Sequence, residues 1–292
     1  MTPEINESVF TPDLLRGRTV LITGGGTGLG RAMALRFSEL GARIFLVARR
    51  EQPLRETSEE IRKRGGACAF ATADVRDPAA VETAVAAAEK EFGRIDTLVN
   101  NAAGNFIART EKLSPNAFAA VVGIVLQGTF HCTVALGRRW IAAQQPGNIL
   151  NIVTTYAATG SGFVVPSACA KAGVLALTRS LAVEWARHRI RVNAIAPGPI
   201  PTEGAWSRLM LTPQIEQRAR DTNPMKRFGR PEELANLAAF LLSGAAEYIN
   251  GECVVMDGGL WLRGAGEFND LADLPEAMWE QLEQARKPRG PA

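Results

Sequence analysis

Hydrophobic and polar positions divide the chain into two kinds of segment that alternate along its length. Short runs rich in aliphatic and β-branched residues predict buried strands, and the longer segments between them repeat apolar residues at helical spacing. The predicted strands are residues 18–23, 42–48, 67–74, 95–101, 147–153, 190–196 and 252–257. Because no polar linker separates two halves, residues 1–292 are predicted to form a single doubly wound α/β domain. Its seven-stranded parallel sheet should carry helices on both faces.

Two segments depart from this alternation. Residues 199–224 form a long insertion after the sixth predicted strand, and we expect a substrate lid there because loops of this length in compact α/β domains are usually lids or binding loops. Residues 263–292 form a charged, partly helical C-terminal extension, for which an interface, a loose terminus and a functional role all stay open. Between the fourth and fifth predicted strands, residues 114–143 are predicted to be helical.

The composition narrows the class of protein. Hydrophobic residues make up 46% of the chain and charged residues 22%, which is typical of a globular protein with a large core. The net charge of +3 is too small to indicate a nucleic-acid-binding protein, although it would suit an anionic cofactor. The first residues are polar and acidic, unlike a secretion signal, and no apolar run approaches the roughly 18 residues of a membrane span. We therefore expect a cytoplasmic protein that binds neither nucleic acid nor membrane.

Cysteine and histidine usage gives no indication of a metal site. The four cysteines are far apart, with no C-x-x-C pair, and the chain has only two histidines. Reduced thiols in a cytosolic protein are the simplest interpretation. We predict neither a metal ion nor a Cys–His nucleophile.

The stretch TGGGTGLG at residues 23–30 is the first candidate binding site. It follows the first predicted strand and precedes a helix, as the phosphate-binding turn of a Rossmann-type dinucleotide site does. The glycines would allow a tight turn, close approach of backbone N–H groups to a pyrophosphate and close helix–strand packing. A glycine-rich turn without a ligand is the alternative. The predicted cofactor contacts are Thr23, Gly24, Gly26, Thr27, Gly28, Leu29 and Gly30.

The end of the second predicted strand indicates which dinucleotide would bind. NAD enzymes usually place an acidic residue there to hold the ribose 2′-hydroxyl, whereas this chain has Arg49 and Arg50, two cations suited to a 2′-phosphate. NADPH is therefore the predicted cofactor, and a pair of solvated arginines is the alternative. Asp74, at the end of the third predicted strand, is placed to reach the adenine. Further predicted cofactor contacts are Val75, Asn101, Ala102, Ala103, Pro197, Gly198, Ile200 and Thr202.

Four motifs together resemble the short-chain dehydrogenase/reductase family over about residues 17–260. They are the glycine turn at 23–30, NNAAG at 100–104, the pair Tyr156 and Lys171, and PGPI at 197–200. More narrowly, four strings resemble the NADPH-dependent 2,4-dienoyl-CoA reductases: NNAAGNF at 100–106, GSGFVVPSACAKAGV at 160–174, GAWSR at 204–208 and GEFNDL at 266–271. A shared fold alone would not assign a function.

The tyrosine is displaced relative to the ordinary pattern of that family. Ordinary members reduce a carbonyl group with a Ser, a Tyr and a Lys, and the Tyr lies four residues before the Lys. Here that position is Ser167, the usual Ser position is Thr154, and the usual Asn of the preceding helix is Val125. Tyr156 stands in a strand-like run, and Lys171 is predicted at the start of a helix. A proton donor moved away from the hydride-accepting carbon would suit reduction of a conjugated C=C bond, because negative charge then develops on a distant thioester oxygen.

The resemblance implies a role for each of these residues. Lys171 would bind the nicotinamide ribose, while Tyr156 and Asn105 would donate hydrogen bonds to the thioester oxygen. Ser167 and Thr154 would orient water, the lysine or the cofactor. NADPH would deliver hydride to the δ carbon of a 2,4-dienoyl-CoA in the β-oxidation of unsaturated fatty acids, giving a 3-enoyl-CoA. The other implied substrate contacts are Arg76, Phe106, Ser114 and Arg208, and the family commonly forms homotetramers.

The sequence leaves other interpretations open. The protein could be another oxidoreductase of the same fold, acting on enoyl thioesters or ketones, or a cofactor-binding protein without turnover. Tyr156 could be an ordinary strand-end aromatic residue, and Asn105 could only cap a turn. Arg76 and Arg208 could be solvated surface charges.

Overall fold

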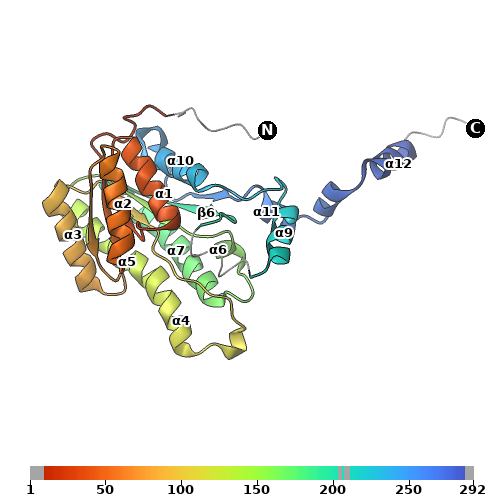
Figure 1. Cartoon of the computed structure of the whole chain (residues 1–292), viewed down its shortest axis with the longest axis horizontal. Helices are drawn as coiled ribbons and strands as arrows, with labels where there is room; N and C mark the ends of the chain where they lie inside the picture. Colours follow the sequence, from red (N-terminus) through yellow and green to blue (C-terminus); the bar gives the residue numbers. More distant parts are fainter. Residues whose placement is uncertain (1–9, 203–205, 207–210, 287–292) are drawn as a thin grey trace, which may run out of the picture.

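A single parallel sheet forms the centre of the protein. The computed structural model describes residues 10–202, 206 and 211–286. In spatial order the seven strands of the described sheet are β3-β2-β1-β4-β5-β6-β7, all paired in parallel, so the predicted fold class is confirmed. Helices surround this sheet (Figure 1). Their bounds are Thr19–Thr23 (β1), Arg43–Ala48 (β2), Cys68–Thr72 (β3), Thr97–Asn100 (β4), Gly147–Ile152 (β5), Ile190–Pro197 (β6) and Cys253–Met256 (β7).

Helices cover both faces of the sheet. The described α-helices are Gly28–Glu39 (α1), Glu51–Lys63 (α2), Pro78–Phe92 (α3), Pro115–Val122 (α4), Gly128–Ala142 (α5), Tyr156–Thr159 (α6), Val165–Glu184 (α7), Pro213–Thr222 (α9), Pro231–Leu242 (α10), Leu260–Ala265 (α11) and Glu276–Arg286 (α12). Alternate residues of one strand point to opposite faces. Val20 and Ile22 of β1 therefore join a core cluster with α1, α2 and α10, whereas Leu21 joins a cluster with α3, α5 and α7.

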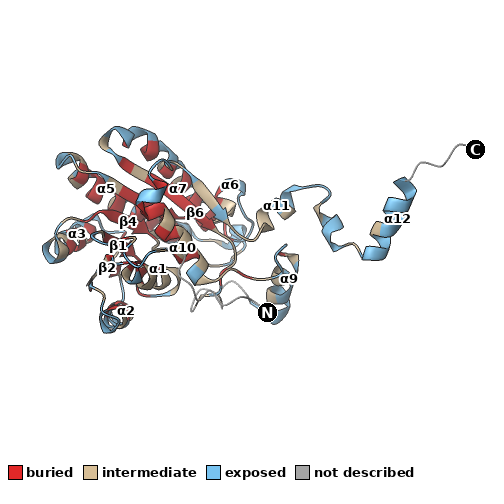
Figure 2. Cartoon of the chain, turned by 90° about the horizontal axis from the view of Figure 1, so that it is seen from above, coloured by how far each residue is buried: buried red, intermediate tan, exposed pale blue. Residues whose placement is uncertain are grey.

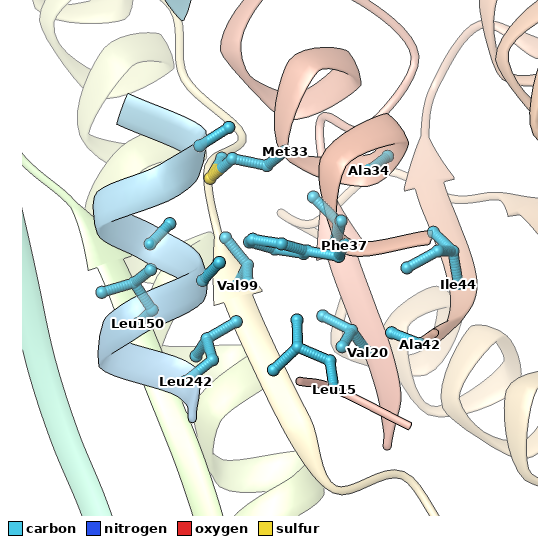
Figure 3. Close-up of a cluster of buried hydrophobic side chains, with 14 of the residues drawn as sticks. Leu15, Val20, Met33, Ala34, Phe37, Ala42, Ile44, Val99, Leu150 and Leu242 are labelled. Carbon is cyan, nitrogen blue, oxygen red and sulfur yellow. The ribbon is translucent and has the colours of Figure 1, made fainter. Parts of the chain in front are cut away.

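The core between the sheet and the helices α1 and α10 is closely packed. Phe37 of α1 is fully buried and lies between α1 and α10, close to Met33 and Val99 (Figure 3). β1 and β4 are buried along their whole length and β2 is buried except at its two end residues, whereas the residues of β7 are exposed or only partly covered. Figure 2 shows the buried residues gathered in the sheet and on the helix faces that cover it. The middle of the sheet is therefore buried, whereas its β7 edge is partly exposed to solvent.

The helical region predicted for residues 114–143 is confirmed, with one irregularity. α4 and α5 are joined by a π-helical turn, Gly123–Gln127, to give one continuous helix from Pro115 to Ala142. By length and composition this helix is apolar enough to cross a membrane, although the sequence contains no uninterrupted apolar run of that length. Half of its most apolar window is buried inside the protein, as in a core helix. Trp140, for example, is buried and donates a hydrogen bond to the carbonyl of Ile95 at 2.7 Å.

Candidate active site

The order of the strands indicates where this sheet would bind a ligand. The strand order reverses between β1 and β4, and ligands of open α/β sheets bind outside the carboxyl ends of the strands at such a switch point. The predicted glycine turn follows β1, the NNAAG segment follows β4, and Tyr156 follows β5. Candidate residues far apart in the sequence are thus brought to the same edge of the sheet.

The glycine turn has the backbone that its sequence predicts. Gly24 and Gly28 have φ angles of +66° and +53°, in the left-handed region that favours glycine. A Cβ on Gly30 would lie 2.2 Å from the carbonyl oxygen of Gly24, so only glycine fits there. A Cβ on Gly28 would lie 3.4 Å from Thr202, so Thr202, another predicted cofactor contact, lies against the turn. Thr27 precedes α1 without a side-chain capping bond, which leaves the first N–H groups of the helix for an anion.

Several predicted cofactor residues hold this turn in place. The Thr23 hydroxyl accepts hydrogen bonds from the backbone N–H groups of Asn101 and Ala102, each at 3.0 Å. The Asn101 side chain in turn donates to the carbonyls of Thr23 and Gly24 at 3.1 and 3.2 Å. The end of β4 is thereby locked to the turn after β1. Of the other predicted residues nearby, Gly26 is buried, Leu29 packs on the core cluster, and Ala103 is exposed.

The predicted 2′-phosphate site lies at the end of β2. Arg49 and Arg50 are both exposed there. Asp74, predicted to reach the adenine, is paired with Arg76, predicted to contact CoA, through hydrogen bonds of 2.6 to 3.0 Å. Arg76, with a smaller contribution from Arg49, holds the pKa of the Asp74 carboxyl below its usual range. Val75 is buried, and its carbonyl contacts a ring nitrogen of His131 at 2.9 Å.

The candidate catalytic residues converge on one phenol. Tyr156 lies with its hydroxyl 3.1 Å from the hydroxyl of Ser167 on α7. The side-chain amide of Asn105 donates to the same phenolic oxygen at 3.4 Å, and its carbonyl oxygen accepts the N–H of Phe106 at 2.9 Å. Phe106 itself packs on the apolar cluster that includes Val125. Three of the predicted catalytic residues therefore form one polar cluster, in which Ser167 is 2% exposed.

The predicted local structure around Tyr156 was wrong. The strand-like run ends at Ile152, and Tyr156 is the first residue of the short helix α6. The N–H of Ala157 bonds to the carbonyl of Thr154 at 3.0 Å, and that of Gly160 to the carbonyl of Tyr156 at 2.9 Å. This helical turn, rather than the alternation of a strand, directs the phenol toward Ser167.

Lys171 also lies elsewhere than predicted. α7 begins at Val165, so Lys171 stands in the second turn of the helix and not at its start. Its ammonium donates a hydrogen bond to the carbonyl of Ile152 at the end of β5. The residue is 6% exposed, and this burial lowers the pKa of the lysine to about 8. Thr154 lies two residues after Ile152. Its hydroxyl is buried and has no hydrogen-bond partner among the described residues.

The predicted lid is only partly described. Arg208 lies outside the described residues. Gly198, which follows Pro197 at the end of β6, donates to the carbonyl of Met256 at 2.9 Å, and Ile200 is buried in the core beneath α10. Within the lid, α9 holds Trp206 through a hydrogen bond from its ring N–H to Glu216 at 3.1 Å. The Ser114 hydroxyl accepts the N–H of Ala117 at 3.2 Å, which is a helix-capping contact.

One group of polar residues below the site was missed from the sequence. Asn100 of β4 donates to Asn151 of β5 at 2.9 Å and to Thr133 of α5 at 3.0 Å, and Asn151 donates to Thr178 of α7 at 2.8 Å. All four are buried. Asparagines inside otherwise apolar strands were the available signal, because buried amides must find partners. This network ties the two strands that carry the candidate site to the helices behind them.

Comparison with known proteins identifies the family. A family profile described as "Enoyl-(Acyl carrier protein) reductase" matches residues 24–261. A solved short chain dehydrogenase from Bacillus anthracis superposes with a TM-score of 0.77 at 45% identity, covering 84% of this chain and 96% of that one. The chain belongs to the short-chain dehydrogenase/reductase family, and it is an oxidoreductase of that family.

Two relatives carry more specific names. A Bacillus subtilis protein named "Probable 2,4-dienoyl-CoA reductase [(2E)-enoyl-CoA-producing]" is 50% identical over 246 residues, which are 84% of this chain and 97% of that protein. A Caenorhabditis elegans protein named "Probable 2,4-dienoyl-CoA reductase 3 [(3E)-enoyl-CoA-producing]" is 44% identical over 261 residues, which are 88% of this chain and 84% of that protein. A solved structure from Agrobacterium tumefaciens that is 34% identical, with a TM-score of 0.79, covering 87% of this chain and 100% of that one, contains bound NADP.

Proposed function

We propose that this protein is an NADPH-dependent 2,4-dienoyl-CoA reductase. The observation that carries the proposal is the cluster of Tyr156, Asn105 and Ser167, in which the phenol stands away from the position that carbonyl-reducing members use. Ser167 occupies that ordinary tyrosine position and hydrogen-bonds the relocated phenol. The names of the similar proteins from B. subtilis and C. elegans agree with this substrate class.

The chain's own residues are suited to stabilise a remote oxyanion. When bound, NADPH supplies the hydride for the δ carbon of the substrate. The electron pair of the diene then moves toward the thioester oxygen, where Tyr156 and Asn105 are two donors from different elements that can meet one acceptor. Ser167 holds the phenol in the orientation in which it can donate. The resulting dienolate takes a proton from water on carbon, so the substrate gains one hydride and one proton.

Lys171 is proposed to act beneath this cluster. Its ammonium is fixed by the carbonyl of Ile152, so the positive charge is held close to the end of β5 and cannot swing into solvent. In that position it can bind the ribose hydroxyls of the cofactor. The unpartnered hydroxyl of Thr154 is a second group that can hydrogen-bond the cofactor or a water molecule.

The choice of NADPH over NADH rests on charge. No acidic residue stands at the end of β2, and Arg49 and Arg50 are exposed there and able to hold a 2′-phosphate. Arg76 is proposed to contact CoA phosphate while it stays paired with Asp74, and Arg208 of the lid is proposed for the same ligand. Ser114 is proposed as a substrate contact in addition to its capping role.

The product is proposed to be a 3-enoyl-CoA. Protonation of the dienolate on the α carbon gives this product, whereas protonation on the γ carbon gives the 2-enoyl isomer. The names of the two relatives divide between these outcomes. Chromatography of the product thioester against both isomers tests this part of the proposal, and a 2-enoyl product would contradict it without affecting the substrate class.

The setting of the enzyme is also a proposal. We propose a cytoplasmic homotetramer that serves the β-oxidation of unsaturated fatty acids. Exposed apolar residues on α4 and α5, Phe118 and Phe130, are 38% and 49% exposed and are suited to pack against other subunits. Sedimentation of the purified protein tests the tetramer.

The substrate class is tested by direct assay. Purified protein is mixed with NADPH and 2,4-hexadienoyl-CoA, and the loss of dienoyl absorbance is followed. A 2-enoyl-CoA and simple ketones serve as competing substrates under the same conditions. We expect turnover of the dienoyl ester well above that of the others. Turnover of enoyl esters or ketones alone would instead make the protein another reductase of this family, and NADPH binding without any turnover would make it a binding protein.

A further inference from the structure

The loop after β3, residues 74–76, lies beside the proposed 2′-phosphate site. β3 pairs with β2 in the sheet, so the carboxyl ends of these two strands are neighbours. Asp74 is close enough to Arg49 for that arginine to contribute to the lowered pKa of the Asp74 carboxyl. A cofactor with its pyrophosphate on the glycine turn after β1 and its 2′-phosphate at the end of β2 would place its adenine at the end of β3. Residues 74–76 are therefore the backbone that would meet the adenosine half.

A histidine of α5 holds the middle of this loop. The ring nitrogen Nδ1 of the half-buried His131 lies 2.9 Å from the carbonyl oxygen of Val75. A carbonyl oxygen can only accept a hydrogen bond, so Nδ1 must carry a proton and donate it, which fixes the tautomer of the neutral ring. Among the described residues this carbonyl has no other hydrogen-bond donor. Because Val75 is only 5% exposed, loss of the His131 donor would leave the carbonyl without a partner in a largely buried position.

Two glycines allow the long helix formed by α4 and α5 to approach the loop closely (Figure 1). A Cβ on Gly128 would lie 2.5 Å from the nearest side-chain atom of Val75, so any larger residue there would push the loop away. A Cβ on Gly123 would lie 3.4 Å from the Arg76 side chain. The π-helical turn Gly123–Gln127 separates the two glycines, and its i→i+5 hydrogen bonding turns residues five apart toward the same side. Such turns often occur at functional sites.

The hydrogen bond from His131 fixes an orientation as well as a position. Elsewhere α5 packs with apolar side chains, such as Leu136, which belongs to the same core cluster as Val75. The carbonyl of Val75 and the N–H of Arg76 belong to one planar peptide group, and that N–H donates to the Asp74 carboxylate at 3.0 Å. The peptide group is thus held at its oxygen by His131, and its nitrogen in turn holds Asp74. A rotation of this peptide group would move the carboxylate that is predicted to reach the adenine.

We propose that His131 is a positioning residue for the adenosine half of the cofactor. It does not touch the cofactor itself, but acts through the peptide group between Val75 and Arg76, which fixes the Asp74 carboxylate at the end of β3. The proposal rests on the proposed function in one respect, which is that NADPH is the cofactor. It is independent of the acyl substrate and of the reaction step.

A pair of substitutions at position 131 separates the donor from the volume of the side chain. His131→Leu keeps much of the volume and removes the donor, whereas His131→Asn places an amide N–H where Nδ1 stands. The dissociation constants of NADPH and of adenosine 2′,5′-bisphosphate, which is the adenosine half alone, are measured by calorimetry. We expect His131→Leu to raise both constants by about fivefold, the effect of one net hydrogen bond, and by the same factor. His131→Asn should restore both to within about twofold of the unaltered chain.

His188→Leu is the control, because His188 is the other histidine of the chain and its ring bonds to Arg187 instead. Melting temperatures show whether each variant is folded, and His131→Gln, with its N–H at the position of Nε2, replaces His131→Leu if that variant is not.

Three results would overturn the positioning role alone: unchanged affinities in His131→Leu, weaker binding of NADPH without weaker binding of the adenosine fragment, or equal behaviour of His131→Asn and His131→Leu. An unaltered chain that binds neither ligand would overturn NADPH as the cofactor, and the role of His131 with it.

Discussion

The proposed cofactor side and the proposed substrate side of this protein are built in different ways. On the cofactor side, backbone atoms approach so closely that a single added Cβ on Gly30 would lie 2.2 Å from the carbonyl oxygen of Gly24. On the proposed substrate side, the candidate groups are side chains from separate elements that meet around Tyr156 through hydrogen bonds of 3.1 to 3.4 Å. A rigid backbone site can stay constant across a family while the side chains opposite it change the reaction. The contrast predicts which substitutions weaken cofactor binding and which slow the reaction step.

Removing the Tyr156 phenol should have the largest effect, and it should lower kcat without changing the affinity for the cofactor. Tyr156→Phe is expected to lower kcat for a dienoyl-CoA by about 10²- to 10³-fold, because one donor to the developing oxyanion is lost. The affinity for NADPH should be nearly unchanged, as measured by fluorescence titration. Tyr248→Phe is the matched control, since Tyr248 is the other tyrosine of the chain and is fully exposed. Equal kcat values for the two variants would remove Tyr156 from the mechanism.

Adding one methyl group to the glycine turn should instead damage binding. Gly30→Ala forces the turn or helix α1 to shift, and we expect the dissociation constant for NADPH to rise by about tenfold or more. Gly264→Ala is the control, because a Cβ there meets no atom within 4 Å. If Gly30→Ala bound NADPH as tightly as Gly264→Ala, the turn would not be the phosphate site.

Changing the charge at the end of β2 should alter cofactor choice more modestly. Arg49→Glu removes a cation from the proposed 2′-phosphate site and supplies an acceptor for a ribose hydroxyl. We expect the ratio of kcat/KM for NADPH over NADH to fall by roughly tenfold, since an exposed charge pair contributes on the order of 1 kcal/mol. Steady-state rates with both cofactors measure this ratio. An unchanged ratio would place 2′-phosphate recognition elsewhere.

The last expected effect concerns the pH dependence of stability, and it changes neither binding nor chemistry directly. Burial lowers the pKa of Lys171 to about 8 from 10.5, so between these pH values the unfolded chain binds more protons at this residue than the folded chain. The contribution of Lys171 to the free energy of unfolding should therefore rise with pH across that window, by at most about 1.4 kcal/mol per pH unit. The free energy of unfolding of the cofactor-free protein and of Lys171→Met is measured with denaturant at pH 8 and pH 10. The value for the variant is then subtracted from the value for the unaltered chain at each pH. A difference that falls with increasing pH would contradict this assignment.

The cofactor side could be predicted from the sequence because its determinants are local. The glycine turn, the strand before it and the helix after it are adjacent in the chain, and the structure places them as predicted. The seven strands were found for a similar reason, since buried parallel strands are short apolar runs. Arg49 and Arg50 lie at the predicted strand end, although their ligand stays a proposal.

The substrate side was harder to predict because it depends on contacts between distant segments. The predicted strand at 147–153 ends within one residue of β5, but the residues that follow it, including Tyr156, were still expected to be strand-like rather than to form α6. The start of α7 was also misplaced, although Pro166 in its first turn was an available signal for a helix beginning before Lys171. The contacts of Asn105 and Ser167 with Tyr156 span 51 and 11 residues, and only the fold brings the three together.

The central claim is that the Tyr156 phenol has been relocated to meet an oxyanion away from the hydride-accepting carbon. A crystal structure of the protein with the cofactor and an unreactive dienoyl-CoA analogue measures this directly, as the distance from the Tyr156 hydroxyl to the thioester oxygen. We predict a hydrogen bond of about 2.6–3.2 Å, with the Asn105 amide on the same oxygen. A phenol turned away from the thioester, with another side chain bonded to that oxygen, would contradict the claim.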